Sequence, residues 1–81
     1  MTYTITQTSN SWRINIDTPE KASPLADWLE QGKDIEVFEI VHLRKLKQTY
    51  LLFQYAYKVP TDTFEAFKQF ISGKIEKFLM Q

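Results

Sequence analysis

The chain contains no cysteine and only one histidine among its 81 residues. Without cysteine there is no disulfide framework, on which small secreted domains usually depend, and no thiolate ligand for zinc. Because no apolar signal segment stands at the N-terminus either, the sequence predicts a cytoplasmic protein. The single histidine is His42. One histidine without cysteine does not supply the three or four ligands of a zinc site, and no serine or threonine stands at a sequence spacing that indicates a catalytic triad. We interpret His42 as a histidine at the end of a strand.

Glycine, net charge and long apolar runs are also scarce. Gly32 and Gly73 are isolated, so the chain has no glycine-rich loop that could hold a nucleotide phosphate. No stretch approaches the roughly 20 apolar residues that a membrane helix needs. The formal net charge is zero, which predicts no overall attraction to nucleic acid or membrane. Glu36 and Glu39 do not share a strand face, so a paired-carboxylate site is not indicated. We therefore expect no enzymatic activity, no cofactor and no metal.

What the chain has is apolar and aromatic residues, at 43% and 15% of the composition. Its length predicts a single domain over residues 1–81, with a small core. The charges are unevenly distributed: residues 1–40 carry seven acids and three bases, and residues 41–81 carry three acids and seven bases. If the two halves interleave in one sheet, these charges largely neutralise one another.

The first half of the chain predicts a hairpin followed by a short helix. Apolar and polar residues alternate over 2–8 and again over 11–17, with Ser9-Asn10 placed for a tight turn between them. In the segment 23–32, Ser23 is a preferred N-cap, Pro24 suits the first helical position and Gly32 suits a left-handed C-terminal position.

The second half repeats this order with a longer hairpin and a longer helix. Residues 34–43 and 49–59 read as strands, joined by a basic loop, and Pro60 ends the second strand. Thr61 or Asp62 is then placed to cap a helix, with Glu65 as the capping-box partner of Asp62. The apolar stripe of this helix consists of Phe64, Phe67, Ile71, Ile75 and Phe78.

The long hairpin is apolar on both of its faces, which is the most informative feature of the chain. Strict alternation places Ile35, Val37, Val41 and Leu43 on one face and Phe38, Ile40 and His42 on the other. Glu39 then falls on an apolar face, where it needs a partner, solvent or a β-bulge. A bulge would reverse the face assignment on one side of it.

The element order β-β-α-β-β-α predicts an α+β domain, in which two helices pack on a four-stranded antiparallel sheet. The simplest arrangement puts both helices on one face. The other face would then be rich in threonine and charge over the first hairpin but apolar over the second. An uncovered apolar patch is typical of an interaction surface. We assign it to Phe38, Ile40, Tyr50 and Leu52.

The basic loop is the second candidate contact. Arg44, Lys45 and Lys47 surround Leu46, so the loop could present an apolar anchor among cations to a protein. These features favour a small non-enzymatic protein-interaction module, acting as a regulator, an adaptor or an inhibitor, or self-associating as a homodimer. The alternative is a nucleic-acid-binding module that uses the basic hairpin 42–50 and the last helix, because cations with a nearby aromatic suit phosphate and base contacts.

Overall fold

The computed structural model describes residues 1–7, 12–32, 35–55 and 64–81, and it confirms the predicted α+β class. The turn expected at Ser9-Asn10, the strand stop at Pro60 and the helix cap at Thr61 or Asp62 lie outside these residues. The elements are β1 (Tyr3–Gln7), β2 (Trp12–Ile16), the 3-10 turn η1 (Pro19–Lys21), α1 (Ala22–Gln31), β3 (Ile35–Leu43), β4 (Gln48–Tyr55) and α2 (Phe64–Leu79).

The four strands form one antiparallel sheet in the order β1-β2-β4-β3. The two hairpins are joined through β2 and β4, where Ile14 lies opposite Leu51 and Trp12 lies opposite Phe53. This pairing places the two strands with the most buried side chains in the centre of the sheet. β1 and β3 are consequently its edges.

Both helices cover the same face of the sheet. The buried apolar side chains of the sheet all belong to the face that the helices cover. Together with the buried residues of α1 and α2 they form one apolar cluster. That cluster consists of Ile5, Trp12, Ile14, Ile16, Ala22, Leu25, Ala26, Leu29, Ile35, Leu51, Phe53, Phe67, Ile71 and Ile75.

The middle of the predicted apolar stripe packs α2 against the core, whereas the two ends of the stripe are less buried. Phe67, Ile71 and Ile75 are fully buried, and the Phe67 ring lies 4.2 Å from that of Trp12. Phe64 remains 36% exposed although it stacks on Trp12, and Phe78 is half-buried beside Trp28. The ends of the stripe therefore lie at the margin of the core.

The first helix begins earlier than its predicted cap. The 3-10 turn Pro19–Lys21 leads directly into it at Ala22, so the prediction of Ser23 as N-cap is wrong. Pro24 still lies in the first turn, where its missing N–H has no intrahelical acceptor to lose. Gly32 has a φ of −78°, so the expected left-handed C-terminal residue is also wrong. The helix is instead fixed by its packing and by the Trp28 indole, whose Nε1 donates to the Lys74 carbonyl of α2 at 2.9 Å.

A β-bulge interrupts β3 and corrects the face assignment of its second half. Val37 lies opposite Phe53, but Glu39 rather than Phe38 lies opposite the next residue of β4, Leu52. Phe38 is therefore the extra residue, and the alternation reverses after it. Glu39 now points away from the core, which is why a carboxylate is tolerated at this position.

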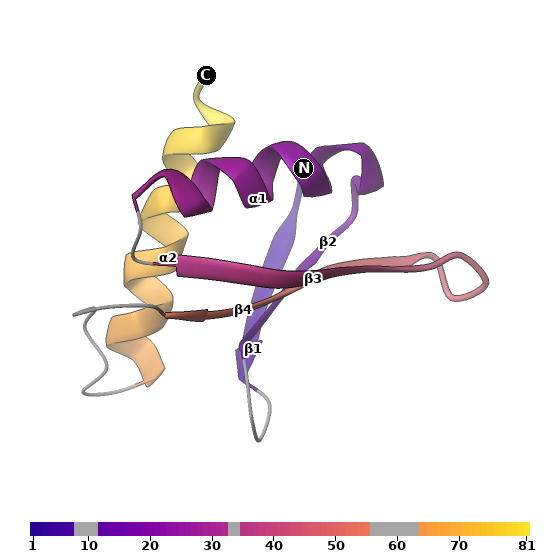
Figure 1. Cartoon of the computed structure of the whole chain (residues 1–81), viewed down its shortest axis with the longest axis horizontal. Helices are drawn as coiled ribbons and strands as arrows, with labels where there is room; N and C mark the ends of the chain where they lie inside the picture. The colour runs from indigo at the N-terminus through magenta and orange to yellow at the C-terminus, as the bar shows by residue number, and fades with distance from the viewer. Residues whose placement is uncertain (8–11, 33–34, 56–63) are drawn as a thin grey trace.

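Figure 1 shows how the long hairpin lies relative to the two helices. The β3–β4 hairpin runs across the view, and its tip extends beyond both helices at the right-hand edge. Helix α1 lies along β3, whereas α2 crosses near the opposite end of the hairpin. No helix in the part of the chain described here is both long and apolar enough to cross a membrane.

Candidate functional site

Among the described residues, no element covers the sheet face opposite the helices, and its side chains stand in cross-strand rows. Thr4, Asn15, Tyr50 and Val41 form one row across β1, β2, β4 and β3, and Thr6, Arg13, Leu52 and Glu39 form the next. Each row is polar over the first hairpin and apolar or mixed over the second. The predicted contrast between the two halves of this face is thus present, with a different set of residues.

The apolar part of this face, here called the open strip, consists of Val41, Leu43, Tyr50 and Leu52, all half-buried. Tyr50 and Leu52 lie where the sequence placed them. Ile40 does not, because the bulge turns it to the helix-covered face, where it lies opposite Leu51 and packs against the core. A patch formed by Phe38, Ile40, Tyr50 and Leu52 together is therefore ruled out by the register.

The bulge residue Phe38 is 50% exposed, the largest exposure of an aromatic ring among the described residues. Its neighbours on β3 differ in character, since Val37 is half-buried and Glu39 is exposed. On the adjoining strand, the Gln54 amide donates to Glu36 at 3.4 Å. This end of the sheet therefore carries an exposed aromatic ring between two carboxylates of one strand.

The hairpin tip, residues 44–47, carries the most exposed apolar side chain of the sheet. Leu46 is 66% exposed, and the backbone N–H of Lys47 donates to the Arg44 carbonyl at 3.2 Å to close the turn. Lys47 has a φ of 53°, a left-handed conformation that non-glycine residues seldom adopt. Among the described residues, the side chains of Arg44, Lys45 and Lys47 have no ion-pair partner.

Hollows border the tip on its flanks. One of about 570 Å³ is lined by His42, Leu43, Arg44, Lys45 and Leu46, and another of about 460 Å³ reaches from the tip to Pro19 and Glu20. His42 itself is exposed, and its Nδ1 lies 3.2 Å from the Thr49 hydroxyl of the neighbouring strand, with which it shares a hydrogen bond. This is a strand-end role, and the described residues contain no group of three or more His, Cys, Asp or Glu side chains that could hold a metal.

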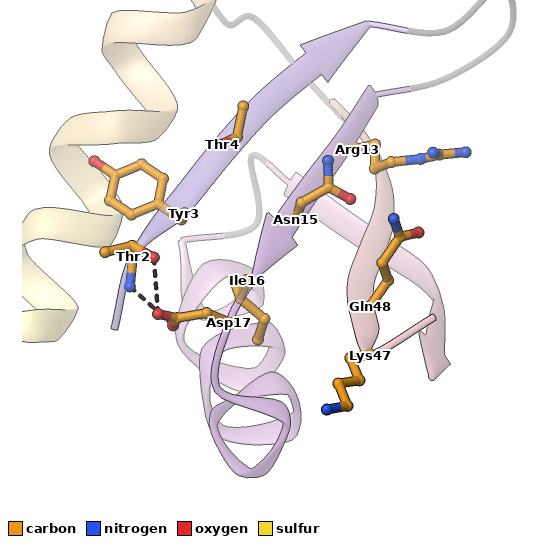
Figure 2. A pocket seen from close by; sticks show the side chains of 9 residues that line it. All are labelled: Thr2, Tyr3, Thr4, Arg13, Asn15, Ile16, Asp17, Lys47 and Gln48. Atoms are coloured by element: carbon orange, nitrogen blue, oxygen red, sulfur yellow. Dashed lines mark hydrogen bonds between the residues drawn. The ribbon is translucent and has the colours of Figure 1, made fainter. Parts of the chain in front are cut away.

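A polar recess of about 380 Å³ lies on the open face, between the edge strand β1 and the base of the hairpin tip. Figure 2 shows Gln48 between Arg13 and Lys47 along one side of it, with Asn15 beside Arg13. Thr4 completes the polar lining from β1. Three strands and the tip turn therefore contribute to a single hollow.

Arg13 is the unusual member of this recess. Its guanidinium carbon lies 4.1 Å from the centre of the Tyr50 ring, a cation–π geometry. Its Nε is buried and has no hydrogen-bond partner among the described residues. A buried donor without an acceptor is destabilising by about 1–3 kcal/mol. The guanidinium thus contacts the Tyr50 ring, while its Nε makes no hydrogen bond among the described residues.

Asp17, the acidic residue at the other end of the recess, accepts hydrogen bonds on both of its carboxylate oxygens. It accepts hydrogen bonds from the Thr18 hydroxyl at 2.7 Å, the Thr2 backbone N–H at 2.9 Å and the Thr2 hydroxyl at 2.8 Å. These donors, with that of Thr18 foremost, lower the pKa of Asp17 to about 2. Its charge is therefore directed at its own hydrogen-bond donors, and it does not ion-pair with Arg13 or Lys47.

Comparison with protein-family models, with curated proteins and with solved structures found no match to this chain. The class of protein is therefore defined by the fold and the surface alone. It is a small α+β domain with one sheet face covered by two helices and the other covered by no element of the described residues.

Sequence reasoning missed Arg13, Asn15, Val41 and Leu43 as residues of the open face site. Arg13 and Asn15 alternate with buried residues in β2, so their facing was readable, but only the β2–β4 pairing brings them beside Tyr50. Val41 and Leu43 were assigned to the opposite face because of the bulge. The sequence signal that a bulge was possible, without giving its position, was Glu39 on an apolar face.

Proposed function

We propose that this protein is a non-enzymatic protein-interaction module, acting as a regulator, an adaptor or an inhibitor. The observation that carries the proposal is an uncovered sheet face whose open strip lies beside a protruding tip with an exposed leucine. Contiguous exposed apolar surface is characteristic of interaction sites on small proteins. An exposed leucine on a protruding turn is placed to enter an apolar pocket of a partner, with the surrounding cations at the polar rim of the contact.

The contact surface extends from the open strip to the hairpin tip. Leu43 pairs with Gln48 at the last position of the ladder, so the strip is continuous with the residues that flank Arg44 and Lys47. Leu46 provides the most exposed apolar group on this surface, and Phe38 lies at its far end. A partner that covered the strip would bury these side chains together.

Capture from a lysate of the native host tests the proposal directly. The wild-type protein serves as bait, with and without nuclease, beside the variants Leu46→Asp and Leu52→Lys. Met80→Asp is the matched control, since Met80 is an apolar residue that is 85% exposed at the end of the chain, outside the proposed surface. We expect nuclease-resistant protein partners that both surface variants lose and the control keeps. Partners retained by both surface variants would contradict the proposal.

Self-association through the same face is the form of the proposal in which the partner is a second copy. Light scattering at micromolar concentration would then give a dimer mass that Leu52→Lys converts to a monomer. Leu52 is the appropriate position because it lies on the open face, whereas Ile40 lies under the helices. A monomer mass for the wild type would exclude the homodimer but not a different protein partner.

The second candidate is a nucleic-acid-binding module, which the stacking of Arg13 on Tyr50 and the unpaired cations of the tip favour. Against it, Glu36 and Glu39 belong to the strand that borders this face, where carboxylates would repel phosphates. Replacing Arg44, Lys45 and Lys47 together with Ala distinguishes the candidates. Nucleic-acid affinity would fall for all sequences, and the salt slope would decrease by up to about three. We expect no binding of the wild type to DNA or RNA at physiological salt.

A further inference from the structure

We infer that the polar recess formed by Arg13, Asn15, Gln48, Lys47 and Thr4 binds a carboxylate side chain of the partner, so that the protein recognises an acidic protein segment. This inference rests on the proposed function and specifies the chemistry of the partner. It is carried by the guanidinium of Arg13, which lies against Tyr50 and has no ion-pair partner among the described residues.

The recess brings together hydrogen-bond donors and positive charge, and no acceptor among the described residues bonds to the Arg13 guanidinium. Arg13 and Lys47 have no ion-pair partner among the described residues, and the Arg13 Nε has no hydrogen bond there. The neighbouring Asn15 and Gln48 amides and the Thr4 hydroxyl supply neutral donors around the same hollow. A carboxylate is the protein group that such a set accommodates, because guanidinium and carboxylate form paired, charge-assisted hydrogen bonds.

The position of the guanidinium favours a hydrogen-bonded contact of defined geometry over a general electrostatic attraction. The cation–π contact with Tyr50, 4.1 Å from the guanidinium carbon to the ring centre, holds the Arg13 side chain on the open face. Tyr50 also belongs to the open strip, so a segment with an acidic residue next to an apolar one would engage the recess and the strip together. Asp17, at the other end of the recess, accepts hydrogen bonds from Thr2 and Thr18, and among the described residues it forms no ion pair with Arg13.

A protein carboxylate is favoured over a nucleic-acid phosphate by the charges near the recess. Leu52, which lies opposite Arg13, also lies opposite Glu39, so the cation and this carboxylate occupy one cross-strand row. A polyanion that followed the open face would meet Glu39 and then Glu36. A single acidic side chain on an otherwise apolar segment would meet neither.

Selection from a phage-displayed library of random 12-residue peptides tests the inference with the full-length protein. We expect enriched peptides to carry Asp or Glu beside an apolar residue. A selected peptide, measured by fluorescence anisotropy, should bind Arg13→Gln about tenfold or more weakly than the wild type. Its amide version, with Asn or Gln at the acidic position, should lose a similar factor. Lys77→Gln is the control, because it removes one exposed positive charge from the last turn of α2.

Two further measurements separate recognition from a general loss of structure. The Arg13 Nε–H resonance in a ¹⁵N-correlated NMR spectrum should move on addition of the peptide, which a purely structural role would not produce. Arg13→Lys retains the charge but not the paired geometry, so we expect it to recover only part of the affinity. Unchanged dispersion of the backbone resonances confirms that each variant is folded.

Several results would overturn the inference. These are enriched peptides without acidic residues, acidic peptides that bind Arg13→Gln as well as the wild type, or a library that yields no binder. Binding of a 12-nucleotide RNA that depends on Arg13 would assign the recess to phosphate instead. If either of the first two results is found while Leu52→Lys still loses its lysate partners, this inference fails but the proposed function is supported. Failure of the inference is therefore distinguishable from failure of the proposed function.

Discussion

Replacing Phe67 with Ala should remove a large part of the stability of this domain. Phe67 is 0% exposed, and its ring lies 4.2 Å from the Trp12 ring and 6.0 Å from the Phe53 ring. Truncating a buried phenylalanine destabilises a protein by about 3–5 kcal/mol, through lost burial and the cavity left behind. A domain of this length has a free energy of unfolding of roughly 4–12 kcal/mol. The variant should therefore lose from about a quarter to all of its stability, and about half at the centre of these ranges.

Urea denaturation followed by tryptophan fluorescence measures this loss. We expect a lower midpoint with an unchanged m-value, and a Tm lower by at least about 12 °C. Gln69→Ala is the matched control, because Gln69 is exposed on the same helix and its removal should change stability by no more than about 0.5 kcal/mol. Phe67→Leu keeps most of the volume and should fall between them. Equal losses for Phe67→Ala and Gln69→Ala would refute the assignment of the buried face of α2.

Two further predictions concern the hydrogen-bonded carboxylate and the tip turn. Since the folded-state pKa of Asp17 is lowered from 3.8 to about 2, its contribution to stability is complete above about pH 4 and is lost as the pH falls toward 2. Urea midpoints of wild type and Asp17→Asn should thus differ most near neutral pH and converge toward pH 2, and a constant gap would contradict the linkage. At the tip, the φ of 53° at Lys47 predicts that Lys47→Val destabilises by about 1–2 kcal/mol, whereas Lys47→Asn is nearly neutral. Equal urea midpoints for the two variants would show that the left-handed turn does not form in solution.

The sequence was most informative where a single periodicity ran without interruption. Alternation in β1 and β2 located the first hairpin, and the spacing of Phe67, Ile71 and Ile75 identified the buried face of α2. Both patterns depend only on the local repeat of the backbone, which is two residues in a strand and 3.6 in a helix. The α+β class followed from the order of these elements.

Local capping signals were less reliable than periodicity. Ser23 and Gly32 have the residue types of helix ends, yet the helix begins at Ala22 and Gly32 remains right-handed. The energy of one cap is about 1 kcal/mol, which is less than the burial of Leu25 and Leu29 against the sheet. Tertiary packing therefore decided where this helix starts and how it ends.

The faces of β3 were decided by one residue that alternation cannot reveal. An extra residue at Phe38 leaves every residue type unchanged but exchanges Ile40 and Val41 between the two sides of the sheet. The bulge keeps Ile35 and Val37 in the core before it and Ile40 after it, while Glu39 turns to solvent. This gain in burial is a property of the whole sheet, so the pattern of β3 alone could not specify it.

The sequence by itself determined the elements, their order and the apolar faces of the first hairpin and the last helix, because these follow from contacts between residues a few positions apart. Only the tertiary structure decided the pairing of β2 with β4, which sets Arg13 beside Tyr50 and brings Gln48 and Lys47 to the same recess. Arg13 lies more than 30 positions before each of the other three residues in the chain. Their juxtaposition depends on strand order and register, and these are fixed by burying Ile14, Leu51 and Phe53 together under the helices.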